Sequence, residues 1–561
     1  MAAGMDRYLG CFPSWGKMAC NRKEDMDRII LISALIIFLC VVFNKISSRI
    51  GVPMLLAFIA LGMVFGVDGI FKVDFEDYRL VSDVSTLALT LIMFYGGFST
   101  NVTLAKPVAL QAILLSTLGV LATAMITGLF CRFVIGMDWI TGFLMGSVVA
   151  STDAASVFSV LRSKRLSLRN NTASLLEVES GSNDPAAYML TIVLLQIKGG
   201  GGGAGFIVST IALQFCLGIA LGVGIAFAAL YIMRRMPFGS DGFDMIFVLG
   251  VALVSYALPA VFGGNGFLST YITGLILGNA KIYEKKRLVL FFDGITGLMQ
   301  ILLFFLLGLL ATPSRIPDVA WQALLIMLFL TFLARPVVVA GLLAPFGCSL
   351  SQILLVSFAG LRGAASIVFA ILAIMRGTPH REIFHIAFFI VLLSILFQGT
   401  LLPWVSRKLD MIDEEEDVLK TFTDYSDALP VQFIQFRIPP GHPWTGASLA
   451  DITLPPDTLL VYRENAEGKT VPDGQTVLEA GDKLVLSANE PEDVNGIRLT
   501  ETHVNKKHSY AGKKLAEIPK EDVNLIILIK RGNEVIIPWG DTEILPGDTL
   551  ICNELMEEAN G

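Results

Sequence analysis

The sequence predicts a polytopic α-helical membrane protein that continues into an α+β tail. Only 16% of the 561 residues are charged, whereas a soluble protein of this length carries about 25%. The deficit lies in residues 28–407, which form a succession of long apolar runs, while residues 408–561 have the composition of a soluble domain. Seven scattered cysteines without a CxxC pair predict neither a disulfide framework nor a zinc site.

A polar extension, residues 1–27, precedes the first apolar run. No small-residue cleavage site follows that run, so we expect a spanning helix rather than a cleaved signal peptide. Met1, Met5 and Met26 are all candidate start residues, and the sequence does not choose among them.

About thirteen apolar runs have the length of a spanning helix, which needs about 20 mostly apolar residues. The predicted helices are 28–47, 52–67, 82–99, 108–130, 138–161, 173–196, 205–233, 244–262, 266–280, 289–311, 318–345, 349–375 and 383–406.

Lys and Arg residues in the short loops predict the orientation of the helices. With the N-terminus outside, the cytoplasmic loops hold fifteen of these residues and the opposite loops hold seven. We therefore expect a multi-pass protein of the cytoplasmic membrane, embedded in lipid, with a cytoplasmic tail.

Three predicted helices carry ionisable residues near their middle. At about 1.5 Å per residue, Asp184 lies roughly 18 Å deep, Asp153 roughly 21 Å and Arg362 roughly 20 Å. All three reach the middle of a hydrocarbon core about 30 Å thick. Ionisable residues at that depth usually serve ion or proton handling, so the three predict one shared site.

The fifth and twelfth predicted helices run in opposite directions, and each is interrupted at its middle. The interruptions are Ser151-Thr152-Asp153 and Gly360-Leu361-Arg362-Gly363. Paired interruptions predict inverted repeats with two discontinuous crossing helices and a midplane site. Asp153 and Arg362 would offset the dipoles of the broken half-helices.

The sixth predicted helix offers oxygen ligands for a cation. Ser180 and Asp184 share a helix face, as do Glu179 and Asn183. Carboxylate, hydroxyl and amide oxygens suit hard cations, and desolvation disfavours the charged form of an isolated carboxylate. Asp184 would therefore take a proton or a monovalent cation, but not both easily.

Arg362 requires a partner at this depth, and Glu179 is the expected one. A structural role is the alternative to direct cation contact for Asp153 and Glu179, because acids inside a membrane also join helices. Gln300 and Arg335 are further intramembrane polar residues for which a direct role is less favoured.

The motifs at Ser151–Asp153, Glu179–Pro185 and Gly360–Gly363 resemble those of the monovalent cation:proton antiporter superfamily, in its sodium/proton-exchanger-like branch. The resemblance covers residues 28–407. It implies a homodimer in which a core domain moves against a dimerisation domain, and exchange of one cation per proton.

The same resemblance implies roles for individual residues. Asp184 would be the exchanging acid, Thr152 and Ser180 would supply oxygen ligands, and Glu179 would pair with Arg362. One departure concerns Tyr95, near which several relatives carry a glutamate, so the cation selectivity of this chain is open.

The tail contains an internal repeat. After a linker at 408–430, residues recur at an offset of 66, and Gly481-Asp482 matches Gly547-Asp548. The intervening alternating, β-branched runs predict short strands. One α+β module is therefore duplicated, at 431–497 and 498–561.

This repeat resembles the C-terminal (TrkA-C) domain of the regulator-of-potassium-conductance family, twice over. No GxGxxG strand-turn-helix unit precedes it, so the usual nucleotide-binding Rossmann half is missing. Such modules dimerise and bind small ligands, and cyclic di-AMP is a candidate regulatory ligand here. A tail that only assembles the dimer is the alternative. We expect no cofactor in the membrane part and no nucleic-acid partner.

These features favour a secondary transporter that exchanges K⁺, or alternatively Na⁺, for H⁺ by alternating access under control of the tail. A ligand-gated cation channel is the runner-up, although the chain has no TVGYG-type filter. A membrane enzyme has little support, because the helices hold no nucleophile elbow, HExxH or Walker motif.

Overall fold

The computed structural model describes residues 54–413 and 431–555, together with residues 31, 34–43 and 45. The gaps within these ranges are 165, 201–202, 236–241, 281, 283–284, 377–381, 456–457, 466–467, 490–496, 506–507, 519–524, 532–533, 537 and 539. The predicted extension 1–27 and most of the predicted linker lie outside the described residues. By its contacts the chain divides into two compact units, Met1–Asp427 and Ala428–Gly561.

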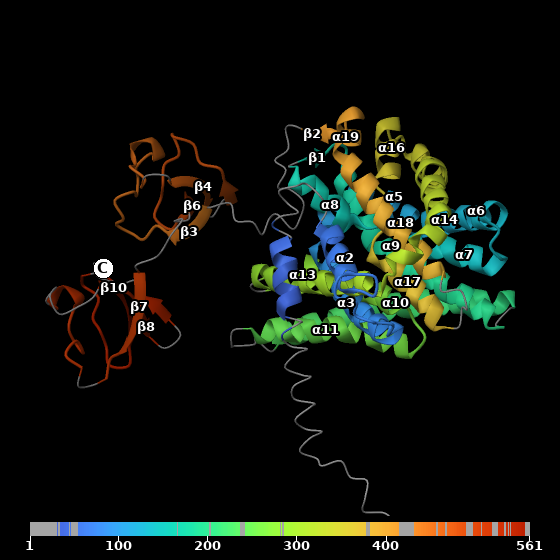
Figure 1. The fold of residues 1–561 in the computed structure, drawn as a ribbon. Coiled ribbons are helices and arrows are strands. Elements are labelled where there is room, and N and C mark those ends of the chain that lie inside the picture. Colours follow the sequence, from blue (N-terminus) through green and yellow to red (C-terminus); the bar gives the residue numbers. More distant parts are fainter. Residues whose placement is uncertain are drawn as a thin grey trace, which may run out of the picture. The chain divides into compact units, whose positions relative to one another are not determined.

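The first unit is helical (Figure 1). Its helices are α2 (Met54–Phe65), α3 (Tyr78–Ser99), α4 (Val102–Ala105), α5 (Ala109–Leu114), α6 (Val120–Phe130), α7 (Trp139–Val148), α8 (Ala154–Ser163), α9 (Thr172–Lys198), α10 (Ala204–Arg235), α11 (Phe243–Val261), α12 (Gly266–Asn279), α13 (Lys285–Leu310), α14 (Ile316–Phe329), α15 (Arg335–Leu343), α16 (Leu350–Phe358), α17 (Ala364–Met375), α18 (Glu382–Leu393) and α19 (Thr400–Lys408). From residue 52 onward, each predicted apolar run coincides with one of these helices or with a consecutive series of them.

Seven helices or helix series among the described residues are long and apolar enough to cross a membrane. Three of the seven are series whose parts are joined by π-helical segments at Leu115–Gly119, Leu330–Ala334 and Ser394–Gly399. Several other apolar helices, such as α2, α7 and α17, are shorter. The structure therefore has the helical membrane architecture that the sequence predicts.

Two helices are interrupted where the sequence predicts it. The α7–α8 helix is broken at 149–153, and the α16–α17 helix at 359–363. The two breaks touch, because the backbone N–H of Asp153 donates to the carbonyl of Leu361 at 2.8 Å. A Cβ atom on Gly363 would lie 2.5 Å from the Cβ of Asp153, so only glycine allows this approach.

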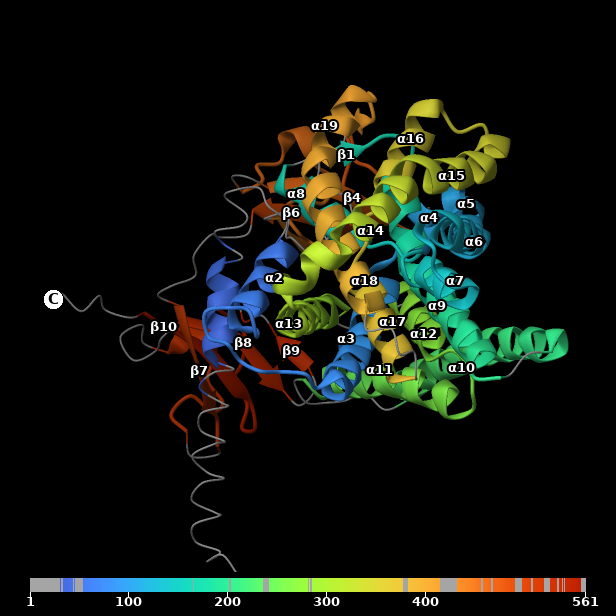
Figure 2. The same cartoon turned by 45° about the vertical axis from the view of Figure 1, so that its right-hand side comes forward.

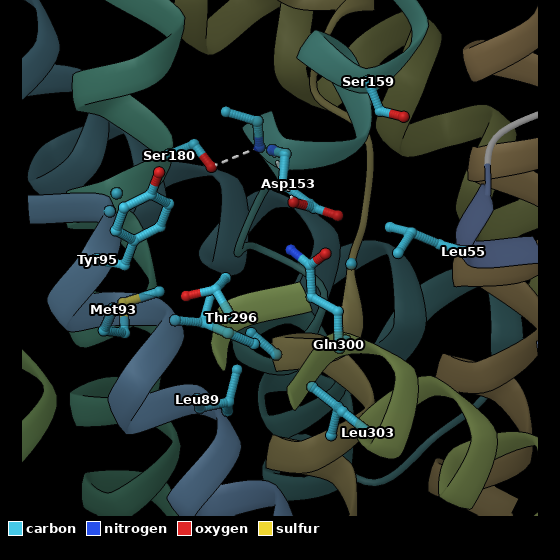
Figure 3. A pocket seen from close by; sticks show the side chains of 18 of the residues that line it. Leu55, Leu89, Met93, Tyr95, Asp153, Ser159, Ser180, Thr296, Gln300 and Leu303 are labelled. Atoms are coloured by element: carbon cyan, nitrogen blue, oxygen red, sulfur yellow. Dashed lines mark hydrogen bonds between the residues drawn. The ribbon is translucent and has the colours of Figure 1, made fainter. Parts of the chain in front are cut away.

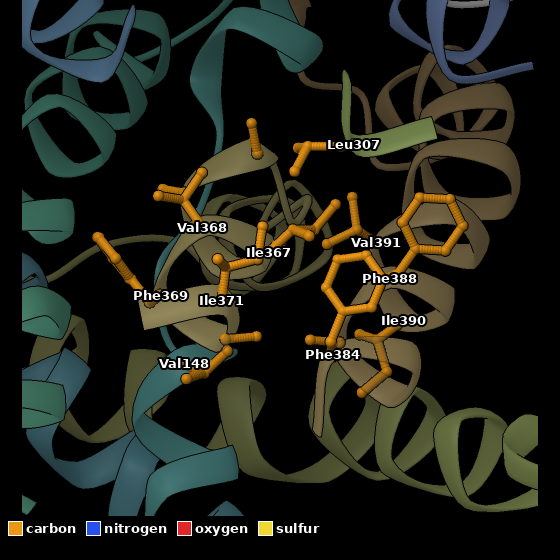
Figure 4. Close-up of a cluster of buried hydrophobic side chains, with 14 of the residues drawn as sticks. Val148, Leu307, Ile367, Val368, Phe369, Ile371, Phe384, Phe388, Ile390 and Val391 are labelled. Atoms are coloured by element: carbon orange, nitrogen blue, oxygen red, sulfur yellow. The ribbon is translucent and has the colours of Figure 1, made fainter. Parts of the chain in front are cut away.

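Apolar side chains of α17 and α18 pack into one buried layer (Figure 4). Ile367 and Ile371 of α17 meet Phe384 and Phe388 of α18, and each is at most 2% exposed. These helices lie side by side in both views, with α17 also in contact with α9 (Figure 1, Figure 2). Tight packing holds such helices together in lipid, because lipid tails are as apolar as the side chains.

A short strand pair joins the end of the helical series to the loop between α8 and α9. Strand β1 (Ser167–Leu168) pairs antiparallel with β2 (Ile412–Asp413). The first residues of the predicted linker are therefore held against the helical unit.

The second unit contains two antiparallel sheets of four strands. The strands are β3 (Val431–Arg437), β4 (Thr458–Asn465), β5 (Gly468–Thr470), β6 (Lys483–Asn489), β7 (Ile497–His503), β8 (Leu525–Arg531), β9 (Glu534–Ile536) and β10 (Thr549–Leu555). The sheet orders are β3-β6-β4-β5 and β7-β10-β8-β9. These are the same arrangement, and β3, β5 and β6 begin 66 residues before β7, β9 and β10. The predicted repeat is present, but the described residues hold strands and two short 3₁₀ helices rather than α-helices, so the tail is β-rich instead of α+β.

Each module buries the aspartate of its Gly-Asp turn against an arginine. The Asp482 carboxylate accepts hydrogen bonds from Arg463 Nε at 2.5 Å and from the backbone N–H of Glu479 at 2.8 Å. Asp548 accepts from Arg531 at 2.8 Å and from the N–H of Leu545 at 2.8 Å. The repeated turn is therefore tied to a strand by the same ion pair in both modules.

Candidate functional site

A cavity of about 540 Å³ lies against the two helix breaks (Figure 3). Ser151, Thr152 and Asp153 of the first break and Ser180 and Asp184 of α9 form one of its walls. Residues of α2, α3 and α13 form the facing wall. We call this space the central cavity.

The lining of the central cavity is acidic. Its charged residues are Asp153, Glu177, Asp184 and Asp293, and no Lys, Arg or His stands among the described residues that line it. Walls of low dielectric focus the potential of such charges and concentrate counter-ions. The cavity therefore favours cations.

The central cavity extends from Asp184 toward one side of the helical unit. Glu177 stands seven residues before Asp184 on α9, or roughly 10 Å along the helix, and it lines the cavity. Ser159 of α8 also lines it. Because residues 164–171 join the end of α8 to the start of α9, the cavity extends toward that loop.

Asp184 lies in this cavity and is 8% exposed. The hydroxyl of Ser151 donates a hydrogen bond to its carboxylate. Pro185 follows inside the helix, and a proline lacks the N–H that would otherwise bond the carbonyl four residues earlier. That carbonyl belongs to Gly181, which also lines the cavity. A carboxylate, a hydroxyl and a freed carbonyl thus stand together, as hard cations prefer.

Ser180, Thr152 and Asn183 link α9 to the first break. The hydroxyl of Ser180 accepts from the N–H of Ala154 at 2.7 Å and donates to the carbonyl of Thr152 at 2.8 Å. The Asn183 amide donates to the hydroxyl of Thr152, while its carbonyl oxygen is buried without a hydrogen-bond partner among the described residues. The structure brings these predicted residues together within one network.

Asp153 caps the second half of the broken helix. Its carboxylate accepts from the N–H groups of Ala155 at 3.0 Å and Ser156 at 3.4 Å, and from the hydroxyl of Ser156. A negative charge at a helix N-terminus offsets the helix dipole. Asp153 therefore has a structural partner in α8 while it also lines the cavity.

The predicted Glu179–Arg362 pair is wrong. Glu179 instead accepts a hydrogen bond from Arg335 of α15, with Oε1 2.9 Å from Nη2. The guanidinium of Arg362 donates to the carbonyls of Ala150 and Ser151, each at 2.8 Å. These carbonyls lose their helical donors where α7 ends, so the arginine satisfies backbone groups that the break leaves unpaired.

Sequence reasoning missed two acids of the cavity, Glu177 and Asp293. Glu177, Gly181 and Asp184 follow helical spacing, so their shared face was readable from the sequence. Asp293 is the acid inside the apolar run of α13, near the start of the predicted span 289–311. The hydroxyl of Tyr95 donates to it at 3.2 Å, so the Tyr95 position faces a carboxylate of another helix.

In this helical membrane unit, two interrupted helices meet beside a buried carboxylate that lines an acidic cavity. These features define a membrane cation transporter. Comparison with known proteins gives the family. The sodium/hydrogen exchanger transmembrane model matches residues 34–408, which is more than half of the chain. The chain belongs to this family of cation:proton antiporters and is a transporter rather than an enzyme.

Curated relatives agree with this assignment. A K(+)/H(+) antiporter NhaP2 from Shewanella sp. (strain MR-4) is 35% identical over 476 residues, covering 83% of this chain and 82% of that protein. A K(+)/H(+) antiporter NhaP from Alkalimonas amylolytica is 33% identical over 437 residues, covering 77% of this chain and 76% of that protein. The resemblance drawn from the sequence motifs is therefore confirmed.

A solved structure shares the fold. The sodium proton antiporter MjNhaP1 from Methanocaldococcus jannaschii superposes with a TM-score of 0.61 at 23% identity, covering 68% of this chain and 99% of that chain. In the tail, the TrkA-C domain model matches residues 433–494 and 499–551, so the predicted duplication of this domain is confirmed.

Proposed function

We propose that this protein exchanges K⁺ for H⁺ across the cytoplasmic membrane, with Asp184 as the group that binds either ion. The observation that carries the proposal is the buried Asp184 carboxylate in a cavity whose charged lining residues, among those that the structure describes, are all acidic. The relatives that cover most of this chain are named K(+)/H(+) antiporters, which favours K⁺ over Na⁺.

Competition at Asp184 couples the two ions. A buried carboxylate is stable when a proton or a cation neutralises it and is unfavourable when it is bare. Oxygen atoms of Ser180, Thr152 and Asn183, with the Gly181 carbonyl, would complete the coordination of the cation, and Asp153 would add a second negative charge. The Glu179–Arg335 pair and the Arg362 contacts would hold the two breaks in place.

We infer alternating access, and a second cavity next to an aromatic cluster supports this part of the proposal. Beyond Asp184 on α9, the ring of Tyr188 packs at 5.1 Å from Phe267 and at 5.8 Å from Phe369, measured between ring centroids. These rings line a second cavity of about 320 Å³, together with Asp83 and Arg376. We infer that the helices of the breaks move as a core against α2, α3 and α13, which opens the second cavity and closes the first.

The membrane arrangement is part of the same proposal. We infer thirteen spans at 28–407 in inverted repeats, the N-terminus outside, and a homodimer in the lipid bilayer. The linker at 408–430 would join this domain to two TrkA-C modules at 431–497 and 498–561 on the cytoplasmic side.

The tail is proposed to regulate exchange by binding a small ligand such as cyclic di-AMP. The support is the double match to the TrkA-C domain. Truncation after residue 420 should change the activation profile with pH and ligand but leave the cation selectivity unchanged. Identical profiles for the full chain and the truncated protein would instead support a purely structural tail.

The proposal is tested by proton flux in proteoliposomes that contain the purified full-length protein. K⁺, Na⁺ and Li⁺ are added in turn under a preset pH gradient, and the lumenal pH is followed. We expect a saturable pH response that is largest with K⁺. Electrogenic cation entry without proton movement would favour the channel hypothesis and overturn the proposal.

A further inference from the structure

The α13 residues that line the central cavity are polar between Asp293 and Gln300. Asp293, Thr296 and Gln300 all line the cavity, and their spacing of three and four residues places them on one side of the helix. Further along the same helix Ile301, Leu303 and Phe304 also line the cavity, so its α13 lining is polar up to Gln300 and apolar beyond it. In Figure 3 this polar face stands opposite Asp153.

A tyrosine orients the carboxylate of this face. Tyr95 of α3 is 7% exposed, and its hydroxyl donates to Oδ1 of Asp293 at 3.2 Å. Asp293 itself is exposed within the helical unit and lines the cavity, so its carboxylate is open to the ions there.

Thr296 adds a buried hydroxyl oxygen to this face. Its side chain is 7% exposed, and its hydroxyl has no hydrogen-bond partner among the described residues. Figure 3 shows Thr296 and Gln300 reaching into the space between Tyr95 and the residues of the opposite wall, with the Gln300 amide directed toward Asp153. A buried hydroxyl without a partner is unfavourable unless water or a ligand satisfies it.

We propose that Asp293, Tyr95 and Thr296 form a second cation site, at which a monovalent cation binds on its way between the cavity mouth and Asp184. A carboxylate and two hydroxyls are hard oxygen ligands of the kind such a cation prefers. The site raises the local cation concentration next to Asp184, and it takes no part in proton exchange. This inference rests on the proposed function.

The first test is the initial rate of exchange in proteoliposomes as a function of K⁺ concentration. Asp293→Asn should raise the half-saturating K⁺ concentration about fivefold, the order expected when one unit charge at contact distance in water is lost. The maximal rate at saturating K⁺ should stay at the wild-type value. Asp293→Glu should restore the half-saturating concentration.

The matched control is Asp244→Asn, which removes the same charge from the first turn of α11, away from the cavity lining. It should leave the half-saturating K⁺ concentration unchanged. Tyr95→Phe provides a second variant that keeps the charge of Asp293 and removes its hydrogen bond. It should produce a smaller rise of the same kind.

The outcomes separate the inference from the proposed function. If the wild type exchanges K⁺ for H⁺ and Asp293→Asn has the wild-type half-saturating concentration, the second site is refuted while the proposed function stands. If Asp293→Asn lowers the maximal rate, Asp293 belongs to the exchange step, which contradicts the proposed role. If the wild type shows no exchange, the proposed function fails and the second site with it.

Discussion

Glu179 and Arg335 form an ion pair inside the helical unit, with Oε1 and Nη2 2.9 Å apart and both side chains at most 6% exposed. Arg335 also donates to the carbonyl of Val356 at 3.3 Å, near the end of α16. A Cβ atom on Gly360 would lie 2.1 Å from Arg335 Nε, so the arginine lies directly against the second helix break. This pair joins the helix of Asp184 to the break that faces it.

Removal of one partner of this pair should destabilise the fold strongly. Glu179→Ala leaves the Arg335 charge buried and unpaired, which typically costs about 3–5 kcal/mol. The thermal unfolding midpoint of the protein in detergent measures the effect. The double variant Glu179→Gln, Arg335→Gln should lose less stability than the single one. Equal midpoints for Glu179→Ala and the wild type would contradict a structural role.

A methyl group at the crossing of the breaks should disrupt the site. In Gly363→Ala the new Cβ would lie 2.5 Å from the Cβ of Asp153, and overpacking of this kind costs about 1–3 kcal/mol. We expect lower thermal stability and loss of exchange in proteoliposomes.

The control for this substitution is Gly250→Ala on α11. No heavy atom lies within 4 Å of the position of its Cβ. It should retain both stability and exchange, since alanine is the better helix former. Equal activity of the two variants would show that the breaks do not need their close approach.

The hydrogen bond from Ser151 should set the pH range of exchange. Ser151 donates to the Asp184 carboxylate, and such a bond favours the charged form of the acid. Ser151→Ala should therefore let protons compete better, and the pH of half-maximal rate should rise by about 0.5–1 unit. The rate is measured over pH 6–9, roughly. An unchanged or lower pH of half-maximal rate would show that Ser151 does not stabilise the anion.

The second tail module should lose stability in acid. The hydrogen bond from Arg531 holds the pKa of Asp548 below its usual range. Because the folded pKa is lower than the unfolded value near 3.9, the pair stabilises the fold above that value, and the contribution disappears as the pH falls through the folded pKa. Asp548→Asn should remove this acid sensitivity and about 1 kcal/mol of stability, since solvent partly screens Arg531.

Hydrogen–deuterium exchange of β8 and β10 in the full-length protein measures this effect. The wild type should lose protection in these strands below about pH 4 relative to neutral pH. In Asp548→Asn, protection should be lower at neutral pH and should change less with acid. Lys514→Gln, which removes an exposed ion pair with Asp541, serves as the control. Acid sensitivity equal to that of the wild type in Asp548→Asn would rule out the pair as its cause.

Most of the fold could be predicted from hydropathy and from the interruptions within the apolar runs. Apolar runs of helical length predicted the helices from residue 52 onward, and the polar or glycine-rich interruptions predicted both helix breaks. The 66-residue repeat gave the equivalence of the two tail modules. The α-helical content of the tail was wrong, because its Gly-rich and Pro-rich connections form turns and 3₁₀ segments that have no strong periodic signal.

The arginine that pairs with Glu179 could not be predicted from the depth of each residue in the membrane alone. Arg335 and Arg362 both lie within predicted spans, and charge counting could not tell which of them meets Glu179. Arg362 instead donates to the carbonyls of Ala150 and Ser151, which the break at the end of α7 leaves without helical donors. Sequence patterns identify charges but not the unpaired backbone groups that a break creates.

The most direct test of the account is proton flux in proteoliposomes with Asp184→Asn beside the wild type. The substitution removes the titratable group and nearly preserves the shape of the side chain, while Asp318→Asn, on an exposed turn of α14, controls for the loss of a carboxylate. We expect K⁺-dependent proton movement in the wild type and in Asp318→Asn, and none in a correctly inserted Asp184→Asn. Exchange at the wild-type rate in Asp184→Asn would contradict it.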